Sequence, residues 1–500
     1  MAQNSMPQTL SMEDSKITVK KILNIVLILS LVFLILFVCS RVLMLKSEDG
    51  ISQWHSYYKQ KPNTVDVLFI GSSHVYCDID NGILWDDYGI SSYDLGGAES
   101  PMWVTYYHLK EAMKYQTPKA VFMEISLAGI RQVNEQPEFW TEDNNYGMRW
   151  NANRINQLKD NTIEKTFPKI LFPLSAMHTR YKELNENDFT DKNNSINYKG
   201  FDPRWGTTEF ETPDAFAITE EEPISEKSEK YFRKIIDLVK EENIPMVMFV
   251  SPYYFEESEQ RMFNYMFRIA EEEGIDGINF NYYYENMGLD FSTDMAENLH
   301  LNSLGTQKFT KYFGQIIKDS FELTDHRGDP KYSSWDVCAE NNRMERADFN
   351  LFQSKTASEF LEQCKNDNYM MIASFGKNVT EVGIYEQTFK DIIDAGIPIE
   401  YITPGNTVVI ESGVVKLANN AEQFRIPITE EYGRFLLKRY KEEEYSENYT
   451  TTIDMGTSKY KMSDDGAQIY VYDMYRKEMV AHINITGAEA EIVKDSKDIY

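Results

Sequence analysis

The residue types that could carry out nucleophilic chemistry gather in two segments that lie far apart in the sequence. The first, Val65–His74, reads V-D-V-L-F-I-G-S-S-H, an apolar run that ends in a small-residue turn with two serines and a histidine. The second, Glu297–Asn302, reads E-N-L-H-L-N. A serine hydroxyl is a weak nucleophile near neutral pH, so acyl transfer needs a base within hydrogen-bond reach and an acid that orients this base. Together the two segments predict a site built from a serine, a histidine and a carboxylate.

Each role in such a site has a first candidate and, in two cases, an alternative. Ser73 is the expected nucleophile, and Ser72 would replace it if the turn were one residue out of register. His300 is the expected base. Glu297 could bend back to the imidazole Nδ1 of His300 if the segment forms a tight loop, and Asp294 is the alternative orienting acid.

Three further polar residues belong to the same regions of the chain. His74 follows the serine directly, but adjacent side chains on a turn diverge, so we expect it to make a structural hydrogen bond rather than to act as the base. Glu99 and Glu124 could line the cleft, although acids are more commonly solvated or placed at helix ends.

An alternation of strand and helix patterns positions both segments. Strands are expected at 65–70, 90–95, 121–125 and 245–250, and the first of them is a buried apolar run. Helical patterns are expected at 102–115, 226–242, 257–273 and 303–319, the last of them capped by Ser303. This rhythm predicts a parallel sheet with helices on both faces. The serine turn then lies at the carboxyl edge of the sheet, where open α/β sheets bind their ligands.

Residues 127–224 interrupt this rhythm. They are rich in Asn, Asp, Thr and aromatic residues and show little periodicity, so we interpret them as a long insertion over the active edge. Its tryptophans could stack on sugar rings at an exposed cleft, or pin the insertion down as a small core, and the second role is favoured. These tryptophans are Trp140, Trp150 and Trp205.

The amino-terminal region contains a candidate membrane anchor. Residues 22–45 are almost wholly apolar, and about 20 such residues span a bilayer as a helix. A cleaved signal peptide is the rival, with Cys39 in a loose lipoprotein-like tetrad, but no small-residue cleavage site fits. Three lysines precede the apolar run, so the positive-inside rule favours a cytoplasmic tail over residues 1–21 and an extracytoplasmic body.

Composition excludes several classes of function. A net charge of −28 over 500 residues disfavours nucleic acid as a partner, because neutralising phosphates requires clustered lysine and arginine. Four cysteines are too few for a disulfide-built scaffold, and Cys338 with Cys364 is the one plausible pair. No cysteine or histidine cluster has metal-site spacing, and no cofactor is expected.

The last third of the chain has a different pattern. A hydrophilic stretch at 323–335 predicts a linker. Residues 336–490 beyond it predict a separate α+β domain. Its β-like runs are expected at 369–374, 407–411 and 468–472, and its helix-like run at 384–395.

The two site segments resemble the SGNH, or GDSL-like, hydrolase superfamily, named for block residues Ser, Gly, Asn and His. Gly71-Ser72-Ser73 stands where the family has its Gly-Asp-Ser block, and Glu297–His300 stands where it has Asp-x-x-His. Tyr93-Asp94-Leu95-Gly96 is similar to the block that supplies the oxyanion-hole glycine. The similarity is closer to a membrane-anchored branch, which includes proteins that resemble the teichoic-acid D-alanyl-transfer partner.

This resemblance implies a three-layer, flavodoxin-like α/β fold over residues 60–322, with Ser73 as nucleophile, His300 as base and Glu297 as orienting acid. The amides of Ser73 and Gly96 are the implied oxyanion hole. Two departures matter: the orienting acid is usually Asp in the family, and the third-block Asn has no match after the third strand. Losing one oxyanion donor typically costs about 2.7–4 kcal/mol, which would mean a slow enzyme, a different donor or a lost activity.

The carboxyl-terminal domain resembles, in spacing and character, the interleukin-like or PANDER-type lectin-like domains. The resemblance rests on Asp367–Ala373, Ile410–Val415 and Ile469–Asp473. It implies a carbohydrate-associated module, and a plain β-rich adhesion or spacer module is the alternative.

These features predict a membrane-anchored, extracytoplasmic serine esterase or acyltransferase that acts on O-acyl groups of a cell-envelope glycan through an acyl-serine intermediate. The expected partners are the membrane, the acylated or acyl-accepting glycan and a membrane-bound acyl donor. The competing prediction is a non-catalytic surface protein that keeps a degenerate hydrolase fold for binding or assembly. Glu297 in place of Asp and the missing Asn motivate this alternative.

Overall fold

The computed structural model describes residues 12–45, 49–126, 136–162, 166–184, 186–189, 198–428, 435–441, 449–455, 459–487 and 489–494. The chain divides into two compact units. Unit 1 comprises Met1–Asp202, Glu209–Leu301 and Gly305–Cys338, and unit 2 comprises Pro203–Thr208, Asn302–Leu304 and Ala339–Tyr500.

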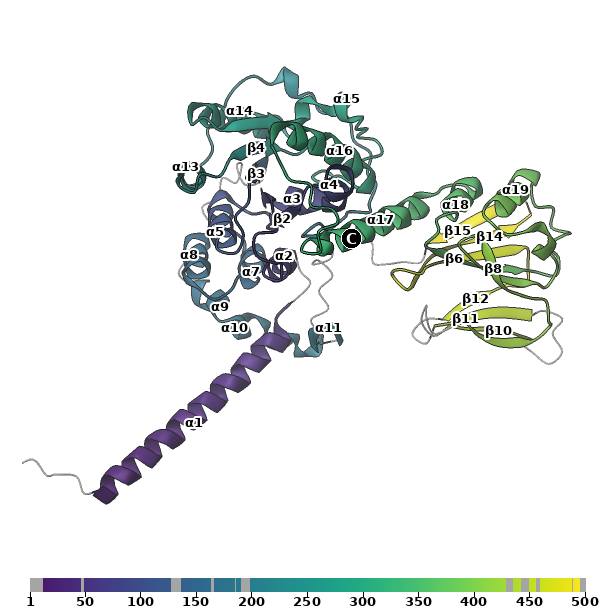
Figure 1. The fold of residues 1–500 in the computed structure, drawn as a ribbon, viewed down its shortest axis with the longest axis horizontal. Helices are drawn as coiled ribbons and strands as arrows, with labels where there is room; N and C mark the ends of the chain where they lie inside the picture. The colour runs from purple at the N-terminus through teal and green to yellow at the C-terminus, as the bar shows by residue number, and fades with distance from the viewer. Residues whose placement is uncertain are drawn as a thin grey trace, which may run out of the picture. The chain divides into compact units, whose positions relative to one another are not determined.

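The first described element is the long apolar helix α1 (Met12–Leu43) (Figure 1). Its segment Lys20–Leu43 is long and apolar enough to cross a membrane. Leu27 and Phe33 are 69% and 70% exposed on it, and the neighbouring apolar side chains are exposed as well. A helix that presents apolar side chains on every face needs an apolar environment. The predicted anchor at 22–45 coincides with this helix. Residues 1–11 of the predicted tail lie outside the described residues.

The centre of unit 1 is a five-stranded parallel sheet in the order β2-β1-β3-β4-β5. Its strands are β1 (Val67–Gly71), β2 (Ser92–Gly96), β3 (Ala120–Glu124), β4 (Met246–Val250) and β5 (Asp276–Asn279). This is one of the common doubly wound orders, in which the direction of winding reverses between β1 and β3. The first four strands are buried along their whole length, as strands covered on both faces should be. The prediction of an α/β unit with a parallel sheet is confirmed.

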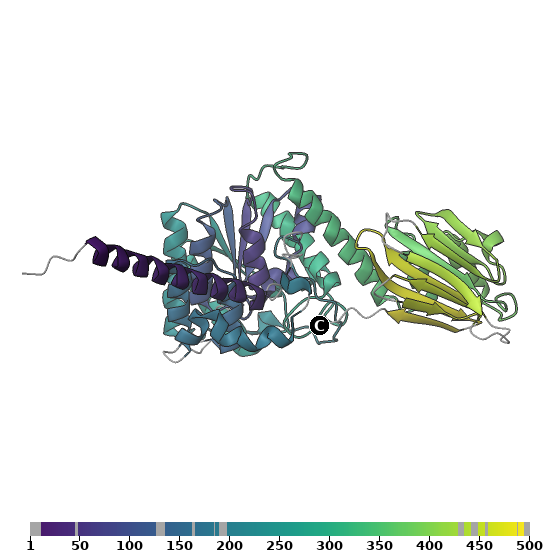
Figure 2. The same ribbon diagram turned by 90° about the horizontal axis from the view of Figure 1, so that it is seen from below.

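Helices cover both faces of this sheet (Figures 1 and 2). One face carries α5 (Met102–Ala112), α13 (Glu226–Glu241) and α14 (Glu257–Glu272), and the other carries α3 (Ser73–Asp78), α4 (Asn81–Tyr88) and α16 (Ser303–Ser320). Aromatic contacts pack α16 on the sheet. The ring centroid of Phe313 lies 5.7 Å from that of Phe69, 5.3 Å from that of Phe122 and 5.0 Å from that of Phe249. Smaller elements flank these layers: α2 (Ile51–Tyr57), η3 (Phe280–Tyr282) and α15 (Tyr284–Met287).

The start of α16 differs in detail from the prediction. Ser303 is its first helical residue rather than its cap. The capping side chain is that of Asn302, whose Oδ1 accepts a hydrogen bond from the Leu304 N–H at 3.0 Å. Asparagine and serine are both good caps, so the sequence pattern alone placed the helix end one residue late.

The described part of residues 127–224 is more helical than predicted. It contains α7 (Glu138–Tyr146), α8 (Ala152–Asn161), α9 (Phe167–Leu171), α10 (Pro173–Met177), η1 (His178–Lys182), α11 (Glu186–Phe189) and η2 (Ala215–Ala217). Buried amides lie between α7 and α8, beside a small apolar cluster that includes Tyr146 and Leu158. Asn161 Nδ2 donates to Gln136 Oε1 at 2.8 Å, and Gln157 Nε2 donates to Asn144 O at 3.0 Å. Helices held together largely by amides have only a weak apolar periodicity, so the sequence pattern did not indicate them.

The predicted linker at 323–335 is instead a packed part of unit 1. His326 Nε2 lies 3.1 Å from a carboxylate oxygen of Asp66. Trp335, in α17 (Ser333–Gln353), is 1% exposed. The hydrophilic residues of this stretch therefore make polar contacts with the rest of unit 1. A segment with such contacts is part of the folded unit and is not a linker.

Unit 2 contains two antiparallel sheets, a six-stranded one in the order β15-β14-β13-β6-β7-β8 and a four-stranded one in the order β12-β11-β10-β9. The six strands are β6 (Tyr369–Phe375), β7 (Thr407–Glu411), β8 (Val414–Asn419), β13 (Ala467–Asp473), β14 (Glu478–Thr486) and β15 (Glu489–Lys494). The four are β9 (Phe424–Ile428), β10 (Phe435–Lys441), β11 (Tyr449–Asp454) and β12 (Lys459–Met462). Helices α18 (Ala357–Gln363) and α19 (Glu386–Asp394) and the turn η4 (Ile399–Tyr401) complete it.

Strand β6 separates two hydrophobic cores in unit 2. Met371 and Ala373 face the core that includes residues of α18 and α19, whereas Ile372 faces the core shared with Leu437 and Ile453 of the four-stranded sheet. Alternate residues of a strand point to opposite faces, so one central strand can serve both cores. The prediction of a carboxyl-terminal domain with its own sheet is confirmed, and its lectin-like character stays a prediction.

All four cysteines are free thiols, so the pair Cys338 and Cys364 does not form a disulfide in this structure. Both are buried. Burial raises the pKa of the Cys364 thiol, which keeps it protonated and unreactive.

Candidate active site

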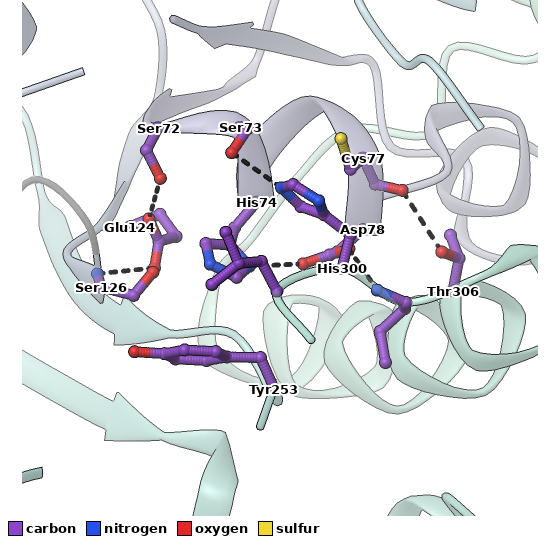
Figure 3. Close-up of polar contacts among 12 residues, drawn as sticks. Ser72, Ser73, His74, Cys77, Asp78, Glu124, Ser126, Tyr253, His300 and Thr306 are labelled. Carbon is purple, nitrogen blue, oxygen red and sulfur yellow. Dashed lines mark hydrogen bonds and ion pairs between the residues drawn. The ribbon is translucent and has the colours of Figure 1, made fainter. Parts of the chain in front are cut away.

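The turn that carries the expected nucleophile begins at Gly71, the last residue of β1. Gly71 has a φ of 146°, and a Cβ added there would lie 2.7 Å from the carbonyl oxygen of Glu124. The close approach of β1 to β3 therefore requires a glycine. The chain turns at Ser72, and α3 begins with Ser73 (Figure 3). This places the serine at the carboxyl edge of the sheet.

Ser73, His300 and Glu297 form a hydrogen-bonded chain. Ser73 Oγ lies 2.7 Å from His300 Nε2, and His300 Nδ1 is hydrogen-bonded to Glu297 Oε1. The second carboxylate oxygen of Glu297 accepts from the N–H of Leu299 at 2.8 Å. When Nδ1 carries the proton and donates to the carboxylate, Nε2 is left as an acceptor for the serine hydroxyl. This arrangement allows the imidazole to take the serine proton.

The three residues differ in their exposure to solvent. Ser73 is 6% exposed, and the side chains of His300 and Glu297 are 12% and 45% exposed. Burial raises the pKa of Glu297, but its hydrogen bond to His300 and the bond from the Leu299 N–H outweigh this effect, and the pKa lies below its ordinary value. Glu297 is therefore a carboxylate at neutral pH, and it favours the tautomer of His300 with the proton on Nδ1.

Asp294, the alternative orienting acid, is engaged elsewhere. Its Oδ2 lies 2.6 Å from Lys308 Nζ and accepts from the Asp290 N–H at 2.8 Å. Its side chain is 1% exposed, so these partners hold it in place. The structure brings Glu297, and not Asp294, to His300.

Ser72, the alternative nucleophile, also has a different partner. It is fully buried, and its hydroxyl donates to Glu124 Oε2 at 3.0 Å. The other oxygen of Glu124 accepts from the N–H of Ser126 at 2.7 Å and from the Ser126 hydroxyl. Glu124 is thus a buried acid that joins the ends of β1 and β3 and is not solvated.

His74 makes the structural hydrogen bond expected of it. Its Nδ1 lies 2.9 Å from Asp78 Oδ2, and both side chains are fully buried. Burial lowers the pKa of His74, against the nearby charges of Glu124 and Glu297, so its imidazole is neutral. Its ring stacks at a tilt on Tyr253, with centroids 4.8 Å apart (Figure 3).

Asp78 has a second role, which the sequence analysis missed. Its Oδ1 accepts from the N–H of Leu301 at 3.0 Å, and Leu301 follows His300 directly. The helix that begins with Ser73 is thereby tied to the loop that carries His300. The spacing of His74 and Asp78, four residues apart on one helix face, is the signal that could have paired them.

Gly96 lies where the end of β2 approaches the nucleophile turn. A Cβ on Gly96 would lie 2.4 Å from the carbonyl oxygen of Ser72, so the packing requires a glycine. The next amide, that of Gly97, donates to the Gly71 carbonyl at 3.1 Å and is used within the sheet. The oxyanion role of the Ser73 and Gly96 amides stays a prediction, and residues 127–135, which follow β3, lie outside the described residues.

Glu99 lies in the turn after β2, with a φ of 42°. A positive φ is uncommon for a residue with a side chain, and such strain gathers at functional edges. Two hydrogen bonds from Gln136 hold this turn in place. Its Nε2 donates to the carbonyls of Ala98 at 3.1 Å and Glu99 at 2.9 Å.

The three tryptophans of the predicted insertion do not form one core. Trp150 is 56% exposed, and the guanidinium of Arg154 lies 4.6 Å from its ring centroid. Trp140 is half-buried beside Phe139. Trp205 belongs to unit 2, where its Nε1 donates to Glu345 Oε1 at 2.6 Å. The favoured prediction of a shared small core is therefore wrong for this set of residues.

The chain of hydrogen bonds from Ser73 through His300 to Glu297, at the carboxyl edge of a parallel sheet, is the feature that a functional assignment must explain. No protein-family model, curated protein or solved structure matches this chain.

Proposed function

We propose that unit 1 is a serine ester hydrolase or O-acyltransferase, anchored by α1 and acting outside the membrane on O-acyl groups of a cell-envelope glycan. One observation carries the proposal: the 2.7 Å contact between Ser73 Oγ and His300 Nε2, with Glu297 on the other imidazole nitrogen. A serine on a sheet edge has many uses, but a serine, a histidine and a carboxylate in series are what nucleophilic acyl transfer requires.

In the first half of the reaction, Ser73 Oγ attacks the carbonyl carbon of the ester and its proton passes to His300 Nε2. Glu297 stabilises the imidazolium that forms, because its pKa is held below the ordinary value and it stays charged. The tetrahedral oxyanion is expected to meet the amides of Ser73 and Gly96. When it collapses, the ester oxygen leaves with the proton from His300, and the acyl group remains on Ser73.

In the second half, a hydroxyl compound attacks the acyl group on Ser73. His300 takes the proton of the attacking oxygen and returns it to Ser73 Oγ as the acyl–serine bond breaks. If the attacking compound is water, the net reaction is hydrolysis, and if it is a sugar hydroxyl, the net reaction is transfer. Both outcomes use the same three side chains, so the site supports both.

The substrate class rests on two further arguments. The segments around Ser73 and His300 resemble a membrane-anchored branch of the SGNH hydrolases, which includes proteins that resemble the teichoic-acid D-alanyl-transfer partner. The helix α1 is long and apolar enough to cross a membrane, which fits an enzyme held at the cell envelope. A membrane-bound acyl donor is part of this proposal for the transfer reaction.

The test uses the purified full chain in detergent and two adjacent serines. A fluorophosphonate probe should label the wild type and the Ser72→Ala variant, and it should fail to label Ser73→Ala and His300→Ala. The hydrolysis of 4-nitrophenyl acetate, and then of an acetylated glycan, should follow the same order. Ser72 is the matched control, because its hydroxyl is bonded to Glu124 rather than to an imidazole.

Equal labelling of Ser73→Ala and the wild type would remove Ser73 from the mechanism. If neither the probe nor any ester reacts with a folded wild type, the competing prediction of a non-catalytic binding or assembly protein gains support. The alternative is suggested by Glu297, which stands where the family has Asp. The hydrogen bond between Glu297 and His300 favours the enzyme instead, because it gives the base an orienting acid.

A further inference from the structure

A set of short helices surrounds the carboxyl end of α1. Along α1 the side chains from Lys20 to Cys39 are exposed, and from Val42 onward they are partly covered. The covering elements are α10, η1 and α11, which contact α1. We call these elements together with α9 the collar (residues 166–184 and 186–189).

Hydrogen bonds and apolar contacts fix the collar to the end of the helix. The guanidinium of Arg180 donates to the carbonyl of Leu43, the last residue of α1, at 3.0 Å and to that of Met44, which follows it, at 3.4 Å. Arg180 also pairs with Asp188 of α11. Met44 packs on a small core that contains Ile170 of α9. A cation on the last carbonyls of a helix is a favourable cap, so the collar and α1 form one structure.

Three aromatic side chains of the collar are exposed, among polar residues such as Lys169 and Glu183. Phe172 is 63% exposed, Tyr181 is 62% exposed and Phe189 is 67% exposed. Lys182 lies over the Tyr181 ring, 5.7 Å from its centroid. Single exposed apolar residues are common on proteins. Here three exposed aromatic residues belong to one short stretch at the base of an apolar helix: one lies between α9 and α10, one on η1 and one on α11.

The length of α1 sets the level of the collar. The apolar segment Lys20–Leu43 has 24 residues, and at about 1.5 Å per residue it is slightly longer than the roughly 30 Å core of a bilayer. The last turn, where Arg180 binds the carbonyls of Leu43 and Met44, then lies at the headgroup level. Aromatic side chains are enriched at that level because they have an apolar body and tolerate water at the edge.

We propose that the collar docks on the phospholipid interface, with Phe172, Tyr181 and Phe189 inserted among the lipid headgroups of the leaflet at the carboxyl end of α1. This inference rests on the proposed role of α1 as a membrane anchor. A second attachment beside the anchor restricts the rotation of unit 1 about α1, so the bilayer holds the edge with Ser73 in a defined orientation.

The test measures the depth of single labels in the full chain reconstituted into liposomes of phosphatidylethanolamine and phosphatidylglycerol. Cys39→Ser removes the exposed native thiol. An environment-sensitive nitrobenzoxadiazole label is then placed through Phe172→Cys, Tyr181→Cys or Phe189→Cys. Lipids with a nitroxide on the headgroup or deep in the acyl chain quench a label according to its depth.

Two control positions bracket the result. Phe33→Cys lies within α1, 70% exposed, and should be quenched most by the deep nitroxide. Phe216→Cys, 72% exposed on η2 and packed on Tyr282, is an equally exposed aromatic outside the collar. We expect the headgroup nitroxide to quench the three collar labels at least about twofold more than the Phe216 label, and more than the deep nitroxide quenches them.

The outcomes separate failure of the collar from failure of the anchor. If Phe33 is quenched and the collar labels behave as Phe216 does, the collar proposal is overturned while the anchor stands. If Phe33 is not quenched, the anchor is wrong and the collar proposal falls with it. If the collar labels are shielded from water without quenching by lipid, a protein covers this surface and the lipid proposal is overturned. Esterase activity, measured on the same samples, tests the Ser73 site independently of all three.

Discussion

Asp78 and Leu301 are joined by a 3.0 Å hydrogen bond between positions 223 residues apart in the sequence. The bond ties the helix that presents Ser73 to the loop that presents His300, while the other Asp78 oxygen holds His74 at 2.9 Å. A proton can pass between Ser73 and His300 only while the two side chains keep their contact. One buried carboxylate therefore positions both side chains through their neighbours in the chain, His74 and Leu301.

The first prediction concerns this positioning. Asp78→Ala removes both bonds and should lower kcat about 10- to 100-fold with little change in KM, because a small misplacement of reacting groups costs about that much in rate. Asp78→Asn keeps one acceptor oxygen for the Leu301 N–H and should recover part of the loss. The measurement is kcat and KM on 4-nitrophenyl acetate, with the rate of fluorophosphonate labelling as a second readout.

Thermal unfolding of both Asp78 variants serves as the control for folding. If kcat falls in proportion to stability in both variants, and Asp78→Asn recovers none of the loss, Asp78 contributes to the stability of the fold and does not position the site.

The second prediction separates the two acids near the base. Glu297→Gln should lower kcat by about 10²- to 10³-fold, because an amide cannot fix the tautomer of His300 or stabilise its cation. The loss should be smaller than for a fully buried acid, since Glu297 is 45% exposed and water can take part of its role. Asp294→Asn should leave kcat within about threefold, because Asp294 is bonded to Lys308 instead.

The same pair of variants should show the opposite order in stability. Asp294 is buried and paired, so its replacement should cost about 1–3 kcal/mol of unfolding free energy, measured in urea. A kcat that falls more in Asp294→Asn than in Glu297→Gln would return the orienting role to Asp294.

The sequence predicts the parts of unit 1 whose signals are local. The strands β1, β3 and β4 are continuous apolar runs, and the helices α13 and α14 have one apolar face, so their periods identify them. The edge strand β5 escapes prediction, because Asp276–Asn279 is short and largely exposed. In unit 2, β8 alternates between half-buried and exposed residues and carries too weak a pattern.

In the site, too, the sequence predicts only the residues that have a local signal. Ser73, His300 and Glu297 stand in two short motifs, and each motif is readable by itself. The engagement of Ser72 by Glu124 and of Leu301 by Asp78 depends on which strand and loop ends meet in space, and no local spacing encodes that. The supporting contacts of a site are therefore the part that only the folded chain reveals.

The third prediction concerns the acid that joins β1 to β3. Glu124→Gln replaces one acceptor oxygen with an NH2 group, so one of the donors on Ser72 and Ser126 must lose its partner. Leaving a buried donor unsatisfied costs about 1–3 kcal/mol, and we expect the unfolding free energy of unit 1 to fall by that amount. Glu257→Gln is the control, because the Glu257 side chain is 75% exposed.

Tryptophan fluorescence in a urea titration makes this measurement. It reports mainly on unit 1, because Trp205 is the one tryptophan of the seven that belongs to unit 2. Equal stability of Glu124→Gln and Glu257→Gln would mean that the buried carboxylate is not a structural bridge.

The last prediction is a pH dependence of stability that comes from His108. Its Nε2 donates to the carbonyl of Asn144 at 2.9 Å, and burial lowers its pKa to about 4, against the opposing effect of that hydrogen bond. In the unfolded chain the same imidazole has an ordinary pKa of about 6.5.

Between about pH 6.5 and 4 the unfolded state therefore binds the extra proton, so this histidine destabilises unit 1 as the pH falls through that window. From pH 7 to 5 the loss amounts to about 2 kcal/mol, because one proton contributes at most roughly 1.4 kcal/mol per pH unit. His108→Gln keeps a donor for the Asn144 carbonyl and cannot titrate, so its unfolding free energy should fall less between pH 7 and 5 than that of the wild type, by on the order of 2 kcal/mol. A His108→Gln variant that follows the same curve as the wild type would show that the imidazole is protonated within the fold.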